Sequence, residues 1–410
     1  MFTARYLGPS NYGLISYASS IVAFILPVMQ LGLSSTLVQE LIATPDREGR
    51  IIGTSIVFNI VSAIVSMVGV VSFVYCANPN EPITVLVCFL YSCCLLFQAS
   101  EMIQYWFQAK LLSKYTSIAS LVAYTITSAY KIIILIQGKD IRWFAVTHVI
   151  EAAIISAILL WTYRRIASQK LSFSFSVGME MINRSKHYII SGIMVSIFQQ
   201  TDRIMLKMMQ SGEDTGYYSS AITCIGITAF VFSAIIESAR PAILESKKYS
   251  QRNFEQRIIG LFSIITYLSL AQSVIMTLCA KPIILILFGK SYLPAVPVLQ
   301  IAVWYCTFGY YGVVRNVWIL GEQKQKCLWI INLAGALTNV ILNFLLIPKW
   351  GAIGAAIASF FTQIVSNFVL SFIIKDIRVC AGLMIQALNP KVLIDMYLSF
   401  KSSEEKRNLE

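Results

Sequence analysis

The chain has 410 residues, of which 57% are hydrophobic and 13% are charged, and its net charge at pH 7 is +12. Ordinary soluble domains carry about 25% charged residues, so this composition excludes a water-soluble enzyme, a disordered protein and a nucleic-acid binder. Excess Lys and Arg is typical of the cytoplasmic loops of membrane proteins. The sequence therefore predicts a polytopic membrane protein.

A helix that crosses the hydrocarbon core of a bilayer needs about 20 apolar residues. Eleven stretches meet this requirement, and the short connections between them carry Pro, Gly, Asn or charged residues. The predicted spans are 13–35, 51–75, 83–107, 115–137, 143–163, 188–209, 216–239, 258–279, 295–320, 327–347 and 351–374. The alternating pattern of a β-barrel does not occur, which predicts an all-α fold.

Lys and Arg are distributed unequally between the two sets of connections. One set holds 22 of them, the other holds 7, and 3 fall within spans. The positive-inside rule places the richer set in the cytoplasm, so the first residue lies outside and the C-terminus inside. An outer start and an odd number of spans are unusual for a two-lobed transporter. We therefore expect a further helix before the first motif of this chain.

The longest basic connection divides the spans into five and six. Gly13 and Gly216 each open a Gly-x-x-Ser-x-Ala pattern, about half the chain length apart. One additional helix would give two halves of six in the same orientation, a parallel repeat. The predicted organisation is an N-terminal lobe at 1–163, a basic cytoplasmic connection at 164–187, a C-terminal lobe at 188–374, and an interfacial segment with a charged cytoplasmic tail at 375–410. A damaged extra span is the alternative for the interfacial segment.

Charged side chains within or beside the spans are candidate functional groups, because lipid burial of a charge is costly. The basic candidates for substrate binding are Arg203, Arg240, Arg315, Lys131 and Arg5. Arg203 is the best placed, since Gln199 and Gln200 lie on the same polar face of its helix. Pairing with a neighbouring acid and snorkelling toward the interface remain alternatives for these groups, and an interfacial anchor is the alternative for Arg5.

The candidates for ion coupling are His148, Glu151, Asp202 and Glu237. His148 and Glu151 are three residues apart and share one face of the fifth span. A buried Glu is costly unless it is protonated or paired, so the two predict a proton relay, with a structural hydrogen bond as the alternative. The sequence contains no Cys or His spacing typical of a metal site. We expect no cofactor, apart from a coupling proton or sodium ion.

Five blocks in order along the chain carry a family resemblance. They are Ala4–Gly13, Trp106–Ala109 with Lys114-Tyr115, Thr201–Arg203 with Gly216–Ala221, Leu287–Tyr292 with Ala295 and Leu299, and Asn343–Pro348 with Gly351–Ala356. Together they resemble the Wzx-type polysaccharide flippases of the multidrug/oligosaccharidyl-lipid/polysaccharide (MOP) exporter superfamily. That family has a full apolar helix before the first block, whereas only three residues precede it here.

The resemblance implies a two-lobed, MATE-like helical bundle in the bacterial cytoplasmic membrane. It implies alternating-access transport of an undecaprenyl-diphosphate-linked oligosaccharide for O-antigen, capsule or exopolysaccharide, with no bond broken. Arg suits such a substrate because its guanidinium donates two parallel hydrogen bonds to phosphate. The implied partners are the lipid-linked oligosaccharide, the bilayer, and the polymerase and glycosyltransferases of the pathway, with no nucleic acid. A MATE-like small-molecule exporter and a membrane polymerase or acyltransferase are the alternatives.

Overall fold

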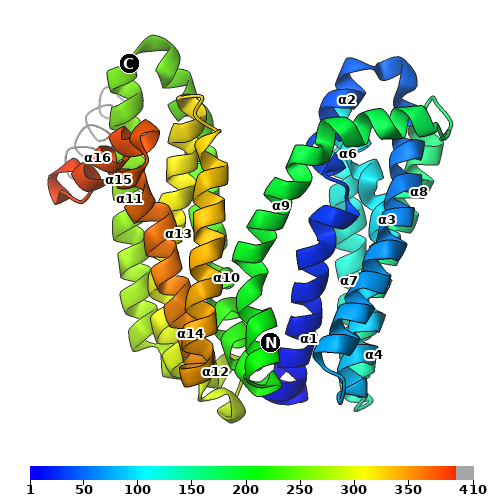
Figure 1. Cartoon of the computed structure of the whole chain (residues 1–410), viewed down its shortest axis with the longest axis horizontal. Helices are drawn as coiled ribbons and strands as arrows, with labels where there is room; N and C mark the ends of the chain where they lie inside the picture. The colour runs from blue at the N-terminus through cyan, green and yellow to red at the C-terminus, as the bar shows by residue number, and fades with distance from the viewer. Residues whose placement is uncertain (394–410) are drawn as a thin grey trace, which may run out of the picture. The chain divides into compact units, whose positions relative to one another are not determined.

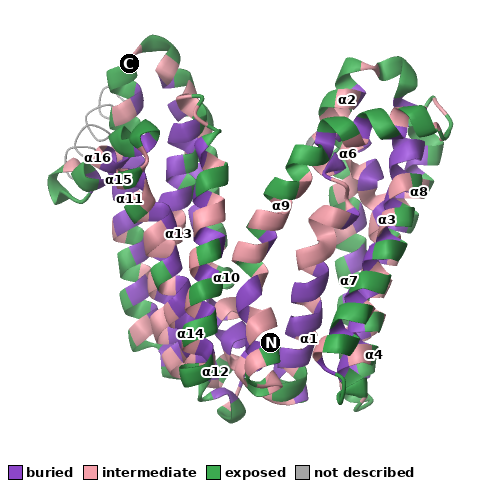
Figure 2. Cartoon of the chain, in the orientation of Figure 1, coloured by how far each residue is buried: buried purple, intermediate pink, exposed green. Residues whose placement is uncertain are grey.

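The computed structural model describes residues 1–393, apart from the side chain of Ser35. This part of the chain is helical and contains no β-strand (Figure 1), which confirms the predicted all-α class. The chain forms two compact units, one from Met1 to Gly216 and one from Tyr217 onward. Within each unit, buried residues gather where helices face their neighbours and exposed residues lie on the outward faces (Figure 2).

The first unit is built around α1, α3, α4, α8 and α9, which pack side by side, with α7 against α8. Its helices are α1 (Phe2–Met29), α2 (Leu37–Ala43), α3 (Glu48–Ala77), α4 (Pro82–Ser92), α5 (Cys94–Gln98), α6 (Ile103–Ala109), α7 (Lys114–Ile136), α8 (Ile141–Ile166) and α9 (Phe175–Met209). A 3₁₀ turn named η3 (Ala99–Met102) joins α5 to α6. Tyr17, Val87 and Leu95 are fully buried at the centre of the unit.

The second unit is built on α11, α13 and α14. Its helices are α10 (Gly212–Tyr249), which starts in the first unit, α11 (Gln251–Leu278), α12 (Ala280–Leu287), α13 (Ala295–Gly321), α14 (Cys327–Ile364), α15 (Leu370–Ile373) and α16 (Arg378–Ala387). A π-helical turn, η5 (Val365–Val369), separates α14 from α15. Phe262, Trp318 and Ile258 form part of the core.

Two glycines break helices that otherwise read as continuous. Gly8 in α1 has φ 74°, and Gly351 in α14 has φ 51°, a region that glycine adopts without the steric cost of a Cβ. At Gly351 the chain reverses, and a Cβ on Gly354 would lie 2.3 Å from the Leu346 carbonyl oxygen. The turn predicted between spans 327–347 and 351–374 is therefore present.

The predicted apolar stretches fall on helices, but their number as membrane spans stays a prediction. Among the described residues, eight helical segments are long and apolar enough to cross a membrane. One of these, Cys327–Ile373, contains two of the predicted stretches. The two remaining predicted stretches correspond to α9 and α13, which have 35 and 27 residues.

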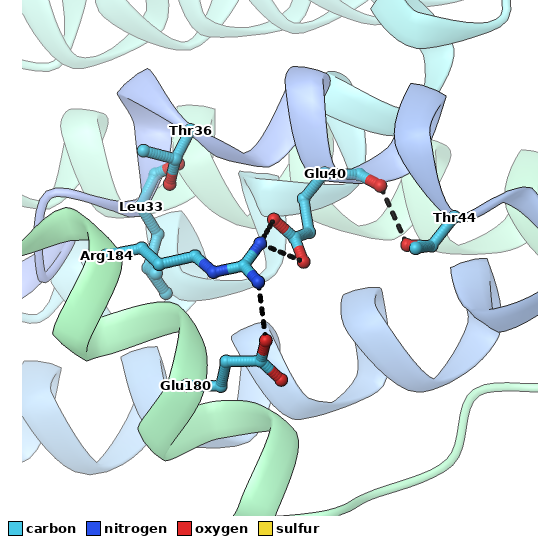
Figure 3. Close-up of polar contacts among 6 residues, drawn as sticks. All are labelled: Leu33, Thr36, Glu40, Thr44, Glu180 and Arg184. Atoms are coloured by element: carbon cyan, nitrogen blue, oxygen red, sulfur yellow. Dashed lines mark hydrogen bonds and ion pairs between the residues drawn. The ribbon is translucent and has the colours of Figure 1, made fainter.

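The basic connection predicted at 164–187 is partly helical, because α9 already begins at Phe175. Arg184 of α9 binds both carboxylate oxygens of Glu40 at 3.2 and 2.9 Å and Glu180 at 2.6 Å (Figure 3). The helix then runs along α1 (Figure 1). The contacts therefore place α9 in the first unit, one helix later than the predicted lobe boundary.

The segment predicted as interfacial contains α16, which packs on α11. Cys380, Met384 and Ala387 of this helix are fully buried, and Tyr267 donates a hydrogen bond to the Leu388 carbonyl at 2.8 Å. This helix is therefore part of the second unit's core. The charged tail at the end of the chain lies outside the described residues.

Candidate functional site

The first unit contains a polar cavity of about 280 Å³ between α1, α4, α5, α7 and α8. Its polar lining residues are Ser19, Tyr91, Gln98, Glu101, Tyr124, His148 and Glu151. Val22, Leu26 and Ile155 supply an apolar rim. Two carboxyl groups and an imidazole therefore line one cavity within the first unit.

His148 and Glu151 lie on α8, which corresponds to the fifth predicted span, and both line this cavity. The His148 ring packs against Tyr91 of α4, with ring centroids 4.5 Å apart and planes tilted by 41°. Lys131 of α7 interacts electrostatically with both His148 and Glu151. Lys131, a candidate for substrate binding, therefore interacts with the ion-coupling candidates His148 and Glu151. The roles of all three residues remain predictions.

Sequence reasoning missed Glu101 and Gln98, which complete the cavity. Glu101 lies in η3, where the helix is interrupted, and Gln98 ends α5 just before it. The Gln98 Oε1 atom is buried and has no hydrogen-bond partner among the described residues. A signal was present, since Glu101 is the one acidic residue in the predicted span 83–107, and an ionisable group in a span is a functional candidate.

Arg203 lies on α9 and is half-buried. Its Nη1 donates to Gln200 Oε1 at 3.4 Å, and its Nε is buried without a hydrogen-bond partner among the described residues. Gln199 is exposed, and Asp202 is 7% exposed. Arg203 therefore retains an unused donor.

The other basic candidates each have a different environment. Arg240 pairs with Glu237 at 2.8 Å on the exposed surface of α10. Arg315 of α13 is 2% exposed, and its Nη1 donates to the Ser366 carbonyl of η5 at 2.8 Å. Arg5 is exposed near the start of α1.

A second ionic contact holds α9 to the first unit near its C-terminal end. Lys207 is buried and binds both carboxylate oxygens of Glu81 at 2.8 and 2.7 Å. Burial alone would raise the pKa of Glu81, but hydrogen bonds from Lys207 and Thr84 outweigh it and lower that pKa below the usual 4.5. The ionised form of Glu81 therefore stabilises the folded state.

This lowered pKa predicts a pH-dependent loss of stability. The contribution of Glu81 should be complete above about pH 4.5 and should vanish as the pH falls through the lower folded-state pKa. Glu81→Gln should cost about 1 kcal/mol of unfolding free energy at pH 7, measured by thermal unfolding in detergent, and the difference should shrink in acid. Glu213→Gln, at an exposed position, is the control. A difference between Glu81→Gln and the parent that stays constant from pH 7 to pH 3 would contradict this assignment.

Comparison with known proteins gives a family match. The family model for polysaccharide biosynthesis proteins matches residues 2–297. A Salmonella typhi protein assigned as an O-antigen transporter is 22% identical over 220 residues, which cover 52% of this chain and 49% of that protein. An uncharacterized membrane protein of Methanocaldococcus jannaschii is 25% identical over 203 residues, covering 48% and 40%. The chain thus spans about half the length of the curated relatives it matches, or less.

Two solved structures are similar in fold. The lipid II flippase MurJ, in an inward closed conformation, superposes with a TM-score of 0.69 at 14% identity, covering 100% of this chain and 98% of that one. An inward-facing multidrug resistance MATE transporter of the MOP superfamily gives 0.68 at 12% identity, covering 94% and 93%. The family match over most of the chain, together with this fold, shows that the protein belongs to the polysaccharide biosynthesis protein family and is a multi-pass membrane protein with the MOP-superfamily fold.

Proposed function

We propose that this protein moves a lipid-linked oligosaccharide from the inner to the outer leaflet of the bacterial cytoplasmic membrane for surface polysaccharide biosynthesis. The observation that carries the proposal is the family match over residues 2–297. The similarity of this chain to the Salmonella typhi protein that is assigned as an O-antigen transporter supports the proposal. The C-terminus lies in the cytoplasm in this proposal, following the positive-inside rule.

The physical task of such a flippase is to carry a polar head group past hydrocarbon. Sugar hydroxyls and a diphosphate lose their hydration there at high cost unless protein groups replace it. Arg203 can supply that replacement, because its Nε has no hydrogen-bond partner among the described residues and its contact with Gln200 is long at 3.4 Å. Its guanidinium therefore has donors available for phosphate.

Transport against a gradient needs an energy source, and the cavity of the first unit supports proton coupling. Glu101, His148 and Glu151 line it together. Uptake of a proton by one carboxyl would remove a charge that is costly in an apolar surrounding. A sodium ion bound by the same carboxylates is the alternative.

Replacing Arg203 tests the substrate contact. Arg203→Ala should remove a phosphate contact worth about 1.5–3 kcal/mol and reduce surface polysaccharide in a flippase-null strain at matched protein levels. Arg203→Lys should keep the charge but lose the two-pronged geometry, giving partial export. Arg378→Ala, which removes an exposed Arg of α16, is the matched control. Full export by both Arg203→Ala and Arg203→Glu would show that Arg203 is an anchor and not a substrate ligand.

A second candidate function is export of a cationic small molecule, as in the MATE transporters. The specific observation that favours it is the pair of carboxyl groups, Glu101 and Glu151, in the cavity of the first unit. Increased sensitivity of a deletion strain to cationic drugs, with normal surface polysaccharide, would favour this candidate over the flippase.

A further inference from the structure

The linker between α8 and α9 is fixed to the start of α3. The Gly49 amide donates to Gln169 Oε1 at 3.1 Å, and the Ser172 amide donates to the Gly49 carbonyl at 3.1 Å. A Cβ on Gly49 would lie 2.4 Å from the Lys170 carbonyl oxygen, and one on Gly53 would lie 2.4 Å from that of Ser172. The two glycines therefore let the backbone of the linker approach α3 closely.

A groove of about 460 Å³ lies between this linker and the C-terminal end of α8. Its lining residues are Tyr163, Arg164, Ala167, Ser168, Gln169, Lys170 and Leu171. Arg164 and Lys170 are exposed and form no hydrogen bond or ion pair with the described residues. The lining contains no acid. The nearby Glu48 accepts a hydrogen bond from Ser168 of the lining at 3.5 Å and pairs with Lys110 at 2.8 Å. Two exposed cations therefore line the groove, with no acid among the other lining residues.

Exposed aromatic rings lie in the sequence directly beside these charges. Trp161 of α8 is 57% exposed, and the Arg165 guanidinium sits over its ring at 4.2 Å. Phe173 of the linker is 54% exposed and stacks on Phe58 with centroids 6.2 Å apart. Aromatic rings collect at the depth of lipid head groups. The exposed Trp161 therefore favours a position of this end of α8 near the lipid head groups.

We propose that this groove binds the phosphate head group of an anionic phospholipid in the adjacent leaflet, with Arg164 and Lys170 as its ligands. The basic groove is complementary in charge to an anionic head group, which supports this occupant. The outer side of the α8 end, beside the exposed rings, also faces phospholipid. Clusters of basic residues at such helix ends bind anionic head groups. The site lies outside the acidic cavity and does not depend on the proposed transport function. A diphosphate on a polyprenyl carrier has related chemistry, and the test separates the two.

The test measures lipid binding to the purified chain in detergent by native mass spectrometry. The probes are cardiolipin, phosphatidylglycerol, neutral phosphatidylcholine and undecaprenyl diphosphate. Each basic residue near an anionic surface contributes about fivefold to binding, so Arg164→Gln with Lys170→Gln should weaken cardiolipin and phosphatidylglycerol binding roughly 25-fold. Phosphatidylcholine binding should not change. Arg164→Lys with Lys170→Arg should restore the binding of both anionic lipids.

A matched control removes two basic residues from the other end of α8. Lys139→Gln with Arg142→Gln should bind the anionic lipids like the parent. The proposal is overturned if the Arg164 and Lys170 variant also binds them like the parent, or if the control loses binding equally. The proposal is also overturned if this variant loses only the binding of undecaprenyl diphosphate, because the groove would then bind the polyprenyl carrier and not a phospholipid.

Discussion

Glu101→Gln should reduce surface polysaccharide export by about tenfold or more, a loss that corresponds to about 1.4 kcal/mol. Gln has nearly the size of Glu but cannot take up or release a proton. Glu101 lines the same cavity of about 280 Å³ as His148 and Glu151, the two groups proposed to carry the coupling proton. The measurement is complementation of a flippase-null strain, with export normalised to the amount of protein in the membrane.

The control for this variant is Glu213→Gln, which removes an exposed acid at the start of α10 and should leave export unchanged. Glu101→Asp keeps an ionisable group and should retain part of the activity. Export by Glu101→Gln at the parent level would show that the cavity does not carry the coupling ion.

Gly216→Ala should lower the unfolding free energy by about 3 kcal/mol, the upper range for overpacking of a close contact. A Cβ at Gly216 would lie 2.1 Å from the Pro9 carbonyl oxygen, and one at Gly13 would lie 1.8 Å from that of Gly212. Both neighbours are backbone atoms, so side-chain rotation cannot relieve the clash. Thermal unfolding in detergent and the amount of folded chain in membranes measure the effect.

Gly226→Ala is the matched control, since it lies on the same helix, α10, and a Cβ there meets nothing within 4 Å. It should be neutral or stabilising by up to about 1 kcal/mol, because Ala favours helix more than Gly does. Equal stability of Gly216→Ala and Gly226→Ala would contradict the close contact between Gly216 and the Pro9 carbonyl.

Hydropathy predicted the helices well but not their grouping. Apolar length depends only on local sequence, so stretches such as 143–163 and 295–320 fall within α8 and α13. The assignment of α9 depends on contacts with α1 and with Glu40, which lie far away in the sequence. The repeated pattern at Gly13 and Gly216 was visible in the sequence. The contact between their two segments, which accounts for both glycines, was not visible there.

The candidate site was predicted in part for similar reasons. His148 and Glu151 were found because they lie on one helix and their spacing fixes a shared face. Glu101 joins them through tertiary packing of an interrupted helix, which periodicity does not reveal. Arg315 was predicted from its place in a span, yet only the structure shows that it is enclosed and donates to the Ser366 carbonyl.

Translocation of a labelled undecaprenyl-diphosphate oligosaccharide by the purified protein in liposomes tests the proposed function most directly. The fraction of label that an impermeant glycosidase reaches from outside should rise faster than in protein-free liposomes. Arg203→Ala and Glu101→Gln should slow this rise, and an imposed proton gradient should change its rate. Translocation no faster than in protein-free liposomes, with transport of a cationic small molecule by the same preparation, would contradict the proposed function.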